Sequence, residues 1–184
     1  MSKRSLLGGW KMYLSNGNMV IRNATASDAP QLCLWWNDGE VMAHAGFPLG
    51  TGQTEEAIAA SLAGDSDQTH RRLIIELAGV PVGEMNYRNK GNAAEIGIKI
   101  CDRAQQNRGY GKKLLSMLIG ELFKMGYGKI ILDTNFENKR ARHVYERLGF
   151  KQRRLNVNAG RNQLGVLQSF VDYELVPGDF CDFA

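Results

Sequence analysis

The sequence predicts a single α+β domain in which helices flank a mostly antiparallel sheet. Its length of 184 residues is enough for one full hydrophobic core, and 43% hydrophobic with 23% charged residues is the balance of a globular protein. Segments with alternating apolar residues, typical of strands, are interleaved with segments whose apolar residues recur at the helical spacing. The predicted order is β-α-α-β-β-β-α-β-α-β-β. We assign residues 19–176 to the domain, residues 1–18 to an N-terminal arm and residues 177–184 to a C-terminal tail.

The first half of the chain supplies one strand, two helices and a meander. The alternating segment MVIRNAT, residues 19–25, predicts the first strand. The next segment predicts a helix with Pro30 in its first turn and Leu32 and Trp35 on one face, and Thr54 is the expected N-cap of a shorter helix. Tight turns join the three strands expected at 71–77, 82–89 and 93–100.

The second half begins with a long helix after Gly111, whose leucines form one apolar stripe. A strand at 129–134 and a compact helix at 138–148 follow, with Gly149 as the left-handed terminator of that helix. The remaining residues predict two strands around a polar loop at 158–163.

Composition limits the compartment and the partners. Cys33, Cys101 and Cys181 are few, odd in number and widely spaced, which fits neither a disulfide framework nor a zinc site and favours the reducing cytoplasm. No apolar run approaches the ~18 residues of a membrane span. The first 18 residues lack the pattern of a signal peptide, so we expect neither a membrane location nor secretion. The net charge of +4 permits an anionic ligand.

The segment QNRGYGKK, from Gln106 to Lys113, precedes the long helix. It is not a Walker loop, because Lys113 follows Gly111-Lys112 where serine or threonine is needed, and it is not a dinucleotide fingerprint, because Leu114 stands in place of the third glycine. The remaining pattern, Gln-x-x-Gly-x-Gly between a strand and a helix, is typical of an anion site made by free backbone N–H groups. The alternative is a glycine-rich turn with a solvated basic helix face.

A second motif, NKRARHVYERLGF, begins with Asn138 some 27 residues after Gly111. With both motifs at this spacing, and with this order of strands and helices, the sequence resembles the GNAT superfamily of acetyl-CoA-dependent N-acetyltransferases. The ending resembles most closely the subgroup of ribosomal-protein N-terminal and polyamine acetyltransferases. The resemblance implies acetyl-CoA as co-substrate and no metal.

The resemblance also implies how the donor is held. The strand before the glycine-rich loop would diverge from its neighbour and pair with pantetheine, and Gly97 would mark a bulge or a close approach there. Asn138 would hydrogen-bond the pantetheine arm, although it could equally be only the cap of its helix. The other implied cofactor-binding residues are Ile98, Lys99 and Ile100 on the strand and Gln106, Arg108, Gly109, Tyr110, Gly111 and Lys112 in the pyrophosphate loop.

The implied reaction is direct attack of an amine on the thioester in a ternary complex, with departure of a thiolate. Tyr145 resembles the tyrosine that donates a proton or a hydrogen bond to the departing sulfur. Glu95 is our first choice for the base, Asp133 the second and Glu84 a third carboxylate nearby in the chain. Each of the three could instead be a solvated strand residue or an ion-pair partner.

The acceptor is expected to be an amine: a peptide N-terminus, a polyamine or a small metabolite. His44 falls where the acceptor loops of the family lie, and a homodimer is common in the subgroup. Two alternatives stay open, namely a CoA-binding protein of this fold without catalysis and an enzyme that uses another acyl-CoA. A basic stretch near Arg153 lacks any nucleic-acid motif or aromatic platform, so we do not expect direct nucleic-acid binding.

Overall fold

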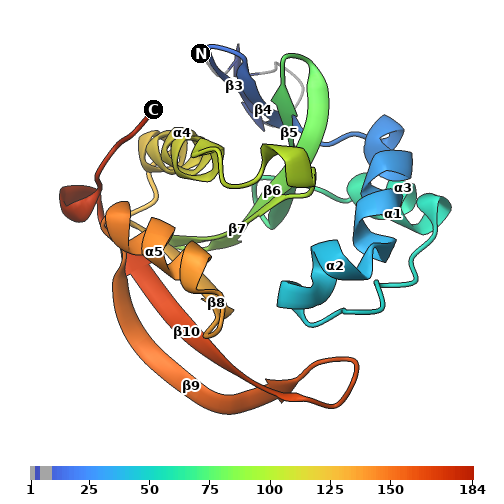
Figure 1. Ribbon diagram of the computed structural model, residues 1–184. Helices are drawn as coiled ribbons and strands as arrows, with labels where there is room; N and C mark the ends of the chain where they lie inside the picture. The colour runs from blue at the N-terminus through green and yellow to red at the C-terminus, as the bar shows by residue number, and fades with distance from the viewer. Residues whose placement is uncertain (1–2, 5–9) are drawn as a thin grey trace.

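The computed structural model describes the backbone of residues 3–4 and 10–184. Its main feature is an eight-stranded sheet in the order β3-β4-β5-β6-β7-β8-β10-β9, in which β7 and β8 are parallel and all other neighbours antiparallel (Figure 1). The strands are β3 (Tyr13–Asn16), β4 (Met19–Asn23), β5 (His70–Leu77), β6 (Val80–Lys90), β7 (Ala93–Ile100), β8 (Lys129–Asn135), β9 (Lys151–Arg161) and β10 (Leu167–Leu175). A separate short pair joins β1 (Lys3–Arg4) to β2 (Trp10–Lys11).

Helices cover the two faces of the sheet unequally. The α-helices are α1 (Ala29–Asn37), α2 (Gly39–Met42), α3 (Glu55–Leu62), α4 (Tyr110–Lys124) and α5 (Lys139–Arg147). Single 3-10 turns are η1 (Ala26–Asp28), η2 (Ala43–Ala45), η3 (Arg103–Gln105) and η4 (Pro177–Asp179). One face packs against α4 and α5, and the other packs against α1 and α3, which lie over β5 and the end of β7 (Figure 1). The predicted α+β class and the order of the predicted elements are confirmed.

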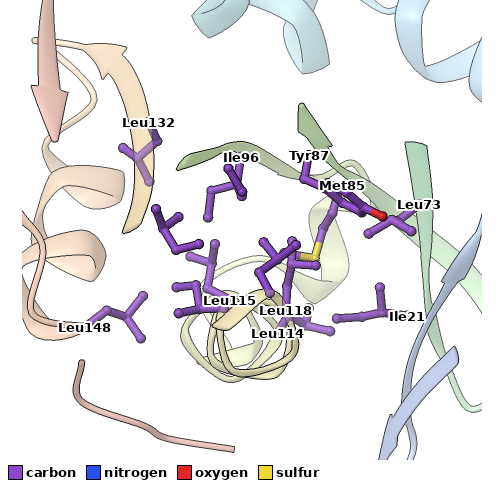
Figure 2. Close-up of a cluster of buried hydrophobic side chains, with 14 of the residues drawn as sticks. Ile21, Leu73, Met85, Tyr87, Ile96, Leu114, Leu115, Leu118, Leu132 and Leu148 are labelled. Atoms are coloured by element: carbon purple, nitrogen blue, oxygen red, sulfur yellow. The ribbon is translucent and has the colours of Figure 1, made fainter. Parts of the chain in front are cut away.

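The main core forms around α4. Its apolar stripe, including Leu114, Leu115 and Leu118, is buried against residues from β4 through β10 (Figure 2). Apolar side chains at this spacing lie on one side of a helix, and their burial holds the helix on the sheet. The first turn of α4 is therefore fixed next to the end of β7.

A smaller polar cluster secures the start of the first helical segment. Arg22 on β4 donates to both carboxylate oxygens of Asp28, at 2.8 and 2.9 Å, and to Glu76 on β5, at 2.7 Å. Burial alone would raise the pKa of Asp28, but hydrogen bonds from Arg22 and Thr25 lower it on balance. This cluster ties the chain leading into α1 to the sheet.

Three boundaries differ from the expectation. Strand β3 pairs with β4, and Met12 and Leu14 are buried, so the sheet begins before the boundary placed at Met19. Residues 1, 2 and 5–9 of the expected arm lie outside the described residues. The expected tail packs on α4 through Phe180 and Phe183, and β9 extends through much of the expected polar loop. Sequence patterns missed these features because short strands and isolated aromatic residues carry little periodicity.

Candidate active site

The first feature of the site is the point where β7 and β8 diverge. The two strands pair only from Ala93 to Glu95. β7 then continues to Ile100 against β6, with no partner on its β8 side among the described strands. Unpaired backbone of this kind can bind an extended ligand as an additional strand. Ile98, Lys99 and Ile100, the predicted cofactor-binding residues of this strand, all lie in the unpaired part.

Gly97 lies in the same stretch but forms no bulge. The register between β6 and β7 is continuous past it. A Cβ atom at Gly97 would lie 2.8 Å from the side-chain nitrogen of Asn86. Of the two expected alternatives, the structure shows the close approach rather than the bulge, and the approaching group is the side chain of Asn86 on β6.

The glycine-rich loop connects β7 to the first turn of α4. Gly109 is the N-cap of α4 and has a φ of 81°, which glycine adopts without strain. Gln106 donates from Nε2 to the carbonyl of Ile100 at 2.8 Å, so the loop is fixed to the end of β7. The first backbone N–H groups of α4 have no intrahelical acceptor, and the helix dipole favours an anion beside them. The loop thus has the geometry of an anion site.

The free space beside Gly111 indicates whether a ligand fits this loop. A Cβ atom there would contact only Ile100 Cδ1, at an ordinary 3.8 Å, so the fold itself tolerates a larger residue. Glycine inside a helix costs about 1 kcal/mol relative to alanine. The space beside Gly111 is what close approach of a phosphate to the helix N-terminus requires, so the residues present fit a diphosphate.

The side chains of the loop have varied contacts. Arg108 donates to Gln105 at 3.0 Å, and the ring of Tyr110 packs on the main core. The ammonium of Lys112 lies 3.8 Å from the ring centroid of Phe183. Lys112 therefore directs its charge to the C-terminal segment, which leaves its backbone N–H as the group available to an anion at the loop.

The loop is also held by Arg140, which the sequence analysis did not select. This residue, in the first turn of α5, donates to Asn107 Oδ1 at 3.0 Å and to Gln106 Oε1 at 3.4 Å. It brings a positive charge across the helix N-terminus and links the two sequence motifs directly. Its position two residues after Asn138, in a basic helix, was the signal that could have identified it.

Asn138 is the N-cap of α5. Its Oδ1 accepts a hydrogen bond from the backbone N–H of Ala141 at 3.2 Å. Of the two predicted roles, the capping role is confirmed, and a contact with pantetheine stays a prediction.

Tyr145 projects from α5 into the core and is 7% exposed. Its ring packs against Phe150 and Tyr173, each with a centroid separation of 5.8 Å. No other group in the described part of the chain forms a hydrogen bond with its hydroxyl. Burial raises the pKa of Tyr145 to about 12, with smaller contributions from Asp133 and Tyr173. At neutral pH the side chain is a protonated hydrogen-bond donor.

Beside the divergence of β7 and β8 lies a cleft of about 450 Å³ on the face opposite α4 and α5. Four carboxylates from three strands line it: Glu95 on β7, Asp133 on β8, and Asp172 and Glu174 on β10. The structure therefore brings together Glu95 and Asp133, two of the predicted bases, which are far apart in the sequence. Asp172 and Glu174 were missed, although their i, i+2 spacing on a strand places them on one face.

The four carboxylates differ in their partners. Glu95 pairs with Lys90 at 3.1 Å, Glu174 pairs with Lys129 and Arg153, both at 2.8 Å, and Asp172 pairs with Arg154 at 3.2 Å. Asp133 has no cationic partner in the described part of the chain. Desolvation raises the pKa of Asp133, and the charges of Glu95 and Asp172 raise it further. A carboxylate with a raised pKa is a stronger base than an ordinary one.

Glu84 is more deeply buried on the same face, and its hydrogen bonds give it a structural role. Its Oε1 accepts from Lys99 Nζ at 2.7 Å and from Trp36 Nε1 at 2.9 Å, and the residue is 5% exposed. These bonds connect α1 to β6 and β7, so the carboxylate is already satisfied. His44 is exposed in η2, whose Cα atoms come within 8 Å of those of β8, and His143 is exposed on α5.

Among the described residues, no three or more His, Cys, Asp or Glu side chains are arranged so that they could hold a metal ion, and none of the helices is long and apolar enough to cross a membrane. The three cysteines are free.

Comparison with known proteins gives consistent results. The family model described as "Acetyltransferase (GNAT) domain" matches residues 18–151, whereas no curated protein matches the chain significantly. Similar solved structures include RimL, a ribosomal L7/L12 α-N-protein acetyltransferase in complex with coenzyme A, at 16% identity, with 90% of this chain and 98% of that chain covered and a TM-score of 0.79. Spermidine N-acetyltransferase from Vibrio cholerae, in complex with CoA and spermine, matches at 20% identity, with 89% and 98% covered and a TM-score of 0.77.

YncA from Salmonella typhimurium, a putative acetyltransferase with acetyl-CoA, matches at 20% identity, with 87% and 94% covered and a TM-score of 0.72. At these identities the structures establish a shared fold. The family model covers most of the chain and includes both sequence motifs, so this protein belongs to the GNAT family of acetyltransferases.

Proposed function

We propose that this protein is an acetyl-CoA-dependent N-acetyltransferase that transfers the acetyl group directly to a primary amine in a ternary complex. The observation that carries the proposal is the divergence of β7 from β8 immediately before the anion-binding first turn of α4. An extended ligand with a terminal diphosphate fits both features at once. The spermidine and RimL enzymes named above, which share this fold, were solved with CoA.

The donor would be held mainly by backbone groups. Ile98 and Ile100 on β7 would pair with the amides of pantetheine, and the N–H groups from Arg108 to Lys112 would bind the pyrophosphate. Arg140 would hold the loop in position. Acetyl-CoA supplies the activated acetyl group as a thioester, and the cleft on the other face of the sheet would admit the amine.

Asp133 is the base that we favour, which reverses the order expected from the sequence. Among the four cleft carboxylates it alone lacks a cationic partner in the described part of the chain, and its pKa is raised. Glu95 is paired with Lys90 and would contribute mainly negative charge. Asp133 would accept the proton of the amine, directly or through water, and Tyr145 would donate a hydrogen bond to the departing sulfur.

The carboxylate lining favours a cationic amine as the acceptor. A lysine-type amine must lose its proton before attack, which costs about 4.6 kcal/mol at pH 7, whereas an α-amine needs only ~1 kcal/mol. Negative charge in the cleft attracts either amine. We also propose that the protein is cytoplasmic, which cell fractionation would test, and that it forms a homodimer, which light scattering would test.

Two measurements test the proposal. Acetyl-CoA should raise the melting temperature in a concentration-dependent manner, as any ligand that binds only the folded state does. Release of free CoA thiol should then depend on an added amine across a panel of polyamines and peptide N-termini. Thermal stabilisation without thiol release would indicate a CoA-binding protein without catalysis. Absence of both would refute the proposal.

A further inference from the structure

Tyr173 lies beside Tyr145 in the core. It is on β10 and is 1% exposed, and its ring centroid lies 5.8 Å from that of Tyr145 at an interplanar angle of 59°. Phe150 packs against the same Tyr145 ring, also at 5.8 Å. Since the Tyr145 hydroxyl forms no hydrogen bond within the described part of the chain, its direction depends on how the surrounding rings hold the side chain.

The hydroxyl of Tyr173 joins β10 to the helix that carries Tyr145. It accepts a hydrogen bond from Arg142 Nε at 3.3 Å and donates one to Glu146 Oε1 at 3.0 Å. Arg142 and Glu146 are one turn apart on α5, and α5 lies over β10 (Figure 1). Tyr145 lies on the same turn. A single side chain therefore holds this turn of α5 through two hydrogen bonds and one ring contact.

Arg142 is itself held in place, so the hydroxyl of Tyr173 meets a fixed partner. The Nη1 of Arg142 donates to the carbonyl of Phe136 at 3.2 Å, and its guanidinium carbon lies 4.6 Å from the centroid of the Phe136 ring. The backbone N–H of Phe136 in turn donates to the carbonyl of Ser169 on β10 at 2.9 Å. The contacts around Tyr173 therefore join α5, the end of β8 and β10 in one network.

Tyr173 also relates Tyr145 to the cleft. On β10, Tyr173 follows Asp172, which pairs with Asp133 on β8. Side chains alternate between the two faces of a strand, so these two carboxylates face the cleft while the ring of Tyr173 faces α5. The strand that carries part of the cleft thus supports Tyr145 from the other face of the sheet.

We propose that Tyr173 is a positioning residue for the transfer step, which holds the ring of Tyr145 at the depth and angle from which its hydroxyl reaches the departing sulfur. The inference rests on the proposed N-acetyltransferase function and on the role of Tyr145 in it. Misplacing a reacting group by about 1 Å can lower a rate by about 10²-fold. Tyr173 would act through Tyr145 and would leave the binding of the donor and of the amine unchanged.

The test is Tyr173→Phe, which removes the hydrogen bonds to Arg142 and Glu146 and keeps the ring. We expect kcat to fall about fivefold, the change expected for one net hydrogen bond, with the KM values of acetyl-CoA and of the amine unchanged. The matched control is Tyr87→Phe. Tyr87 is also a fully buried tyrosine on an internal strand, and its hydroxyl donates to Asp67 at 2.7 Å. An equal loss of kcat in Tyr87→Phe would overturn the proposal, because it would show that any loosening of the core slows the reaction.

A double-mutant cycle tests whether Tyr173 acts through Tyr145. In the Tyr145→Phe background, Tyr173→Phe should lower kcat no further, because the hydroxyl that Tyr173 positions is already absent. A further fivefold loss in the double variant would show that the two residues act independently and would overturn the proposal. An unchanged kcat in Tyr173→Phe alone would overturn it as well.

A second measurement does not depend on activity. The flip rate of the Tyr145 ring, followed by NMR with labelled tyrosine, should rise in Tyr173→Phe, because the neighbouring ring is no longer anchored, and stay unchanged in Tyr87→Phe. An unchanged flip rate in Tyr173→Phe would overturn the positioning contact. If the wild-type protein acetylates no amine, the proposed function fails, whereas the flip rate still reports whether Tyr173 holds the ring.

Discussion

Replacing Tyr145 with phenylalanine tests whether this residue acts as an acid or as a hydrogen-bond donor. The substitution removes one oxygen atom and keeps the ring contacts with Phe150 and Tyr173. Burial raises the pKa of Tyr145 to about 12, whereas an ordinary thiol has a pKa of about 8.5. Complete proton transfer to the thiolate would therefore be uphill by about 5 kcal/mol, at 1.36 kcal/mol per pKa unit. Donation of a hydrogen bond is the role that this pKa permits.

A hydrogen bond to a charged group contributes roughly 1.5–3 kcal/mol. We expect Tyr145→Phe to lower kcat by about 10- to 150-fold, since this bond strengthens as charge develops on the sulfur. The thermal shift produced by acetyl-CoA should be retained. Tyr127→Phe, at the far end of α4, is the matched control, because its ring packs on Tyr87 away from the cleft.

The pH profile separates the two roles further. If Tyr145 only donates a hydrogen bond, it stays protonated up to about pH 12, and kcat shows no loss attributable to it at pH 8–10. A basic limb in this range that disappears in Tyr145→Phe would refute the reasoning, because it would show that the hydroxyl titrates. A kcat within threefold of the wild type would reduce Tyr145 to a packing residue.

Three further predictions follow from charge and backbone geometry. Asp133→Asn should lower kcat yet raise the melting temperature at pH 7, because a raised folded-state pKa means that ionised Asp133 destabilises the fold. The gain in melting temperature should vanish as the pH falls towards the ordinary pKa of Asp. A variant no more stable than the wild type at pH 7 would contradict this prediction. Gly111→Ala should stabilise the free protein by up to about 1 kcal/mol and weaken the binding of acetyl-CoA, as measured by thermal-shift titration. Gly109→Ala should instead destabilise the free protein, because Gly109 has a φ of 81°. Asp28→Asn should lower the free energy of unfolding measured in urea at pH 7. Because the folded-state pKa of Asp28 is depressed, the difference from the wild type should shrink as the pH falls below the ordinary pKa of Asp. A difference that does not change with pH would exclude the ion pair with Arg22 as its cause.

The loop and helix geometry proposed to hold the donor could be predicted from the sequence because it is local. The loop from Gln106 to Lys112 and the helix that begins at Asn138 are each one continuous segment, and their chemistry depends on backbone N–H groups and helix termini that glycine and asparagine mark directly. For Gly97 the sequence left a bulge and a close approach open, because a glycine inside a strand does not identify its neighbour, which here is Asn86.

The cleft proposed to take the acceptor could be predicted only in part, since it is assembled from segments far apart in the chain. The choice of Asp133 over Glu95 as the proposed base depends on ion pairs. Lys90 forms an ion pair with Glu95, whereas no cation in the described part of the chain pairs with Asp133. The hydrogen bonds that join Gln163, in the β9–β10 turn, to the loop at residues 46–50 could not be predicted either, because a glutamine in a polar turn carries no sequence signal for its partner.

This division has a physical basis that bears on the function. In the proposed function the donor is the same in every cycle, so its site can rely on fixed backbone geometry next to a packed helix. In the proposed function the acceptor enters and leaves across the other face, where four carboxylates, three of them ion-paired, line the cleft. Exposed ion pairs of this kind rearrange at low cost, whereas the buried stripe of α4 does not. Changes in acceptor preference should therefore map to the carboxylates that line the cleft, and changes in acetyl-CoA affinity to residues 106–112 and Arg140.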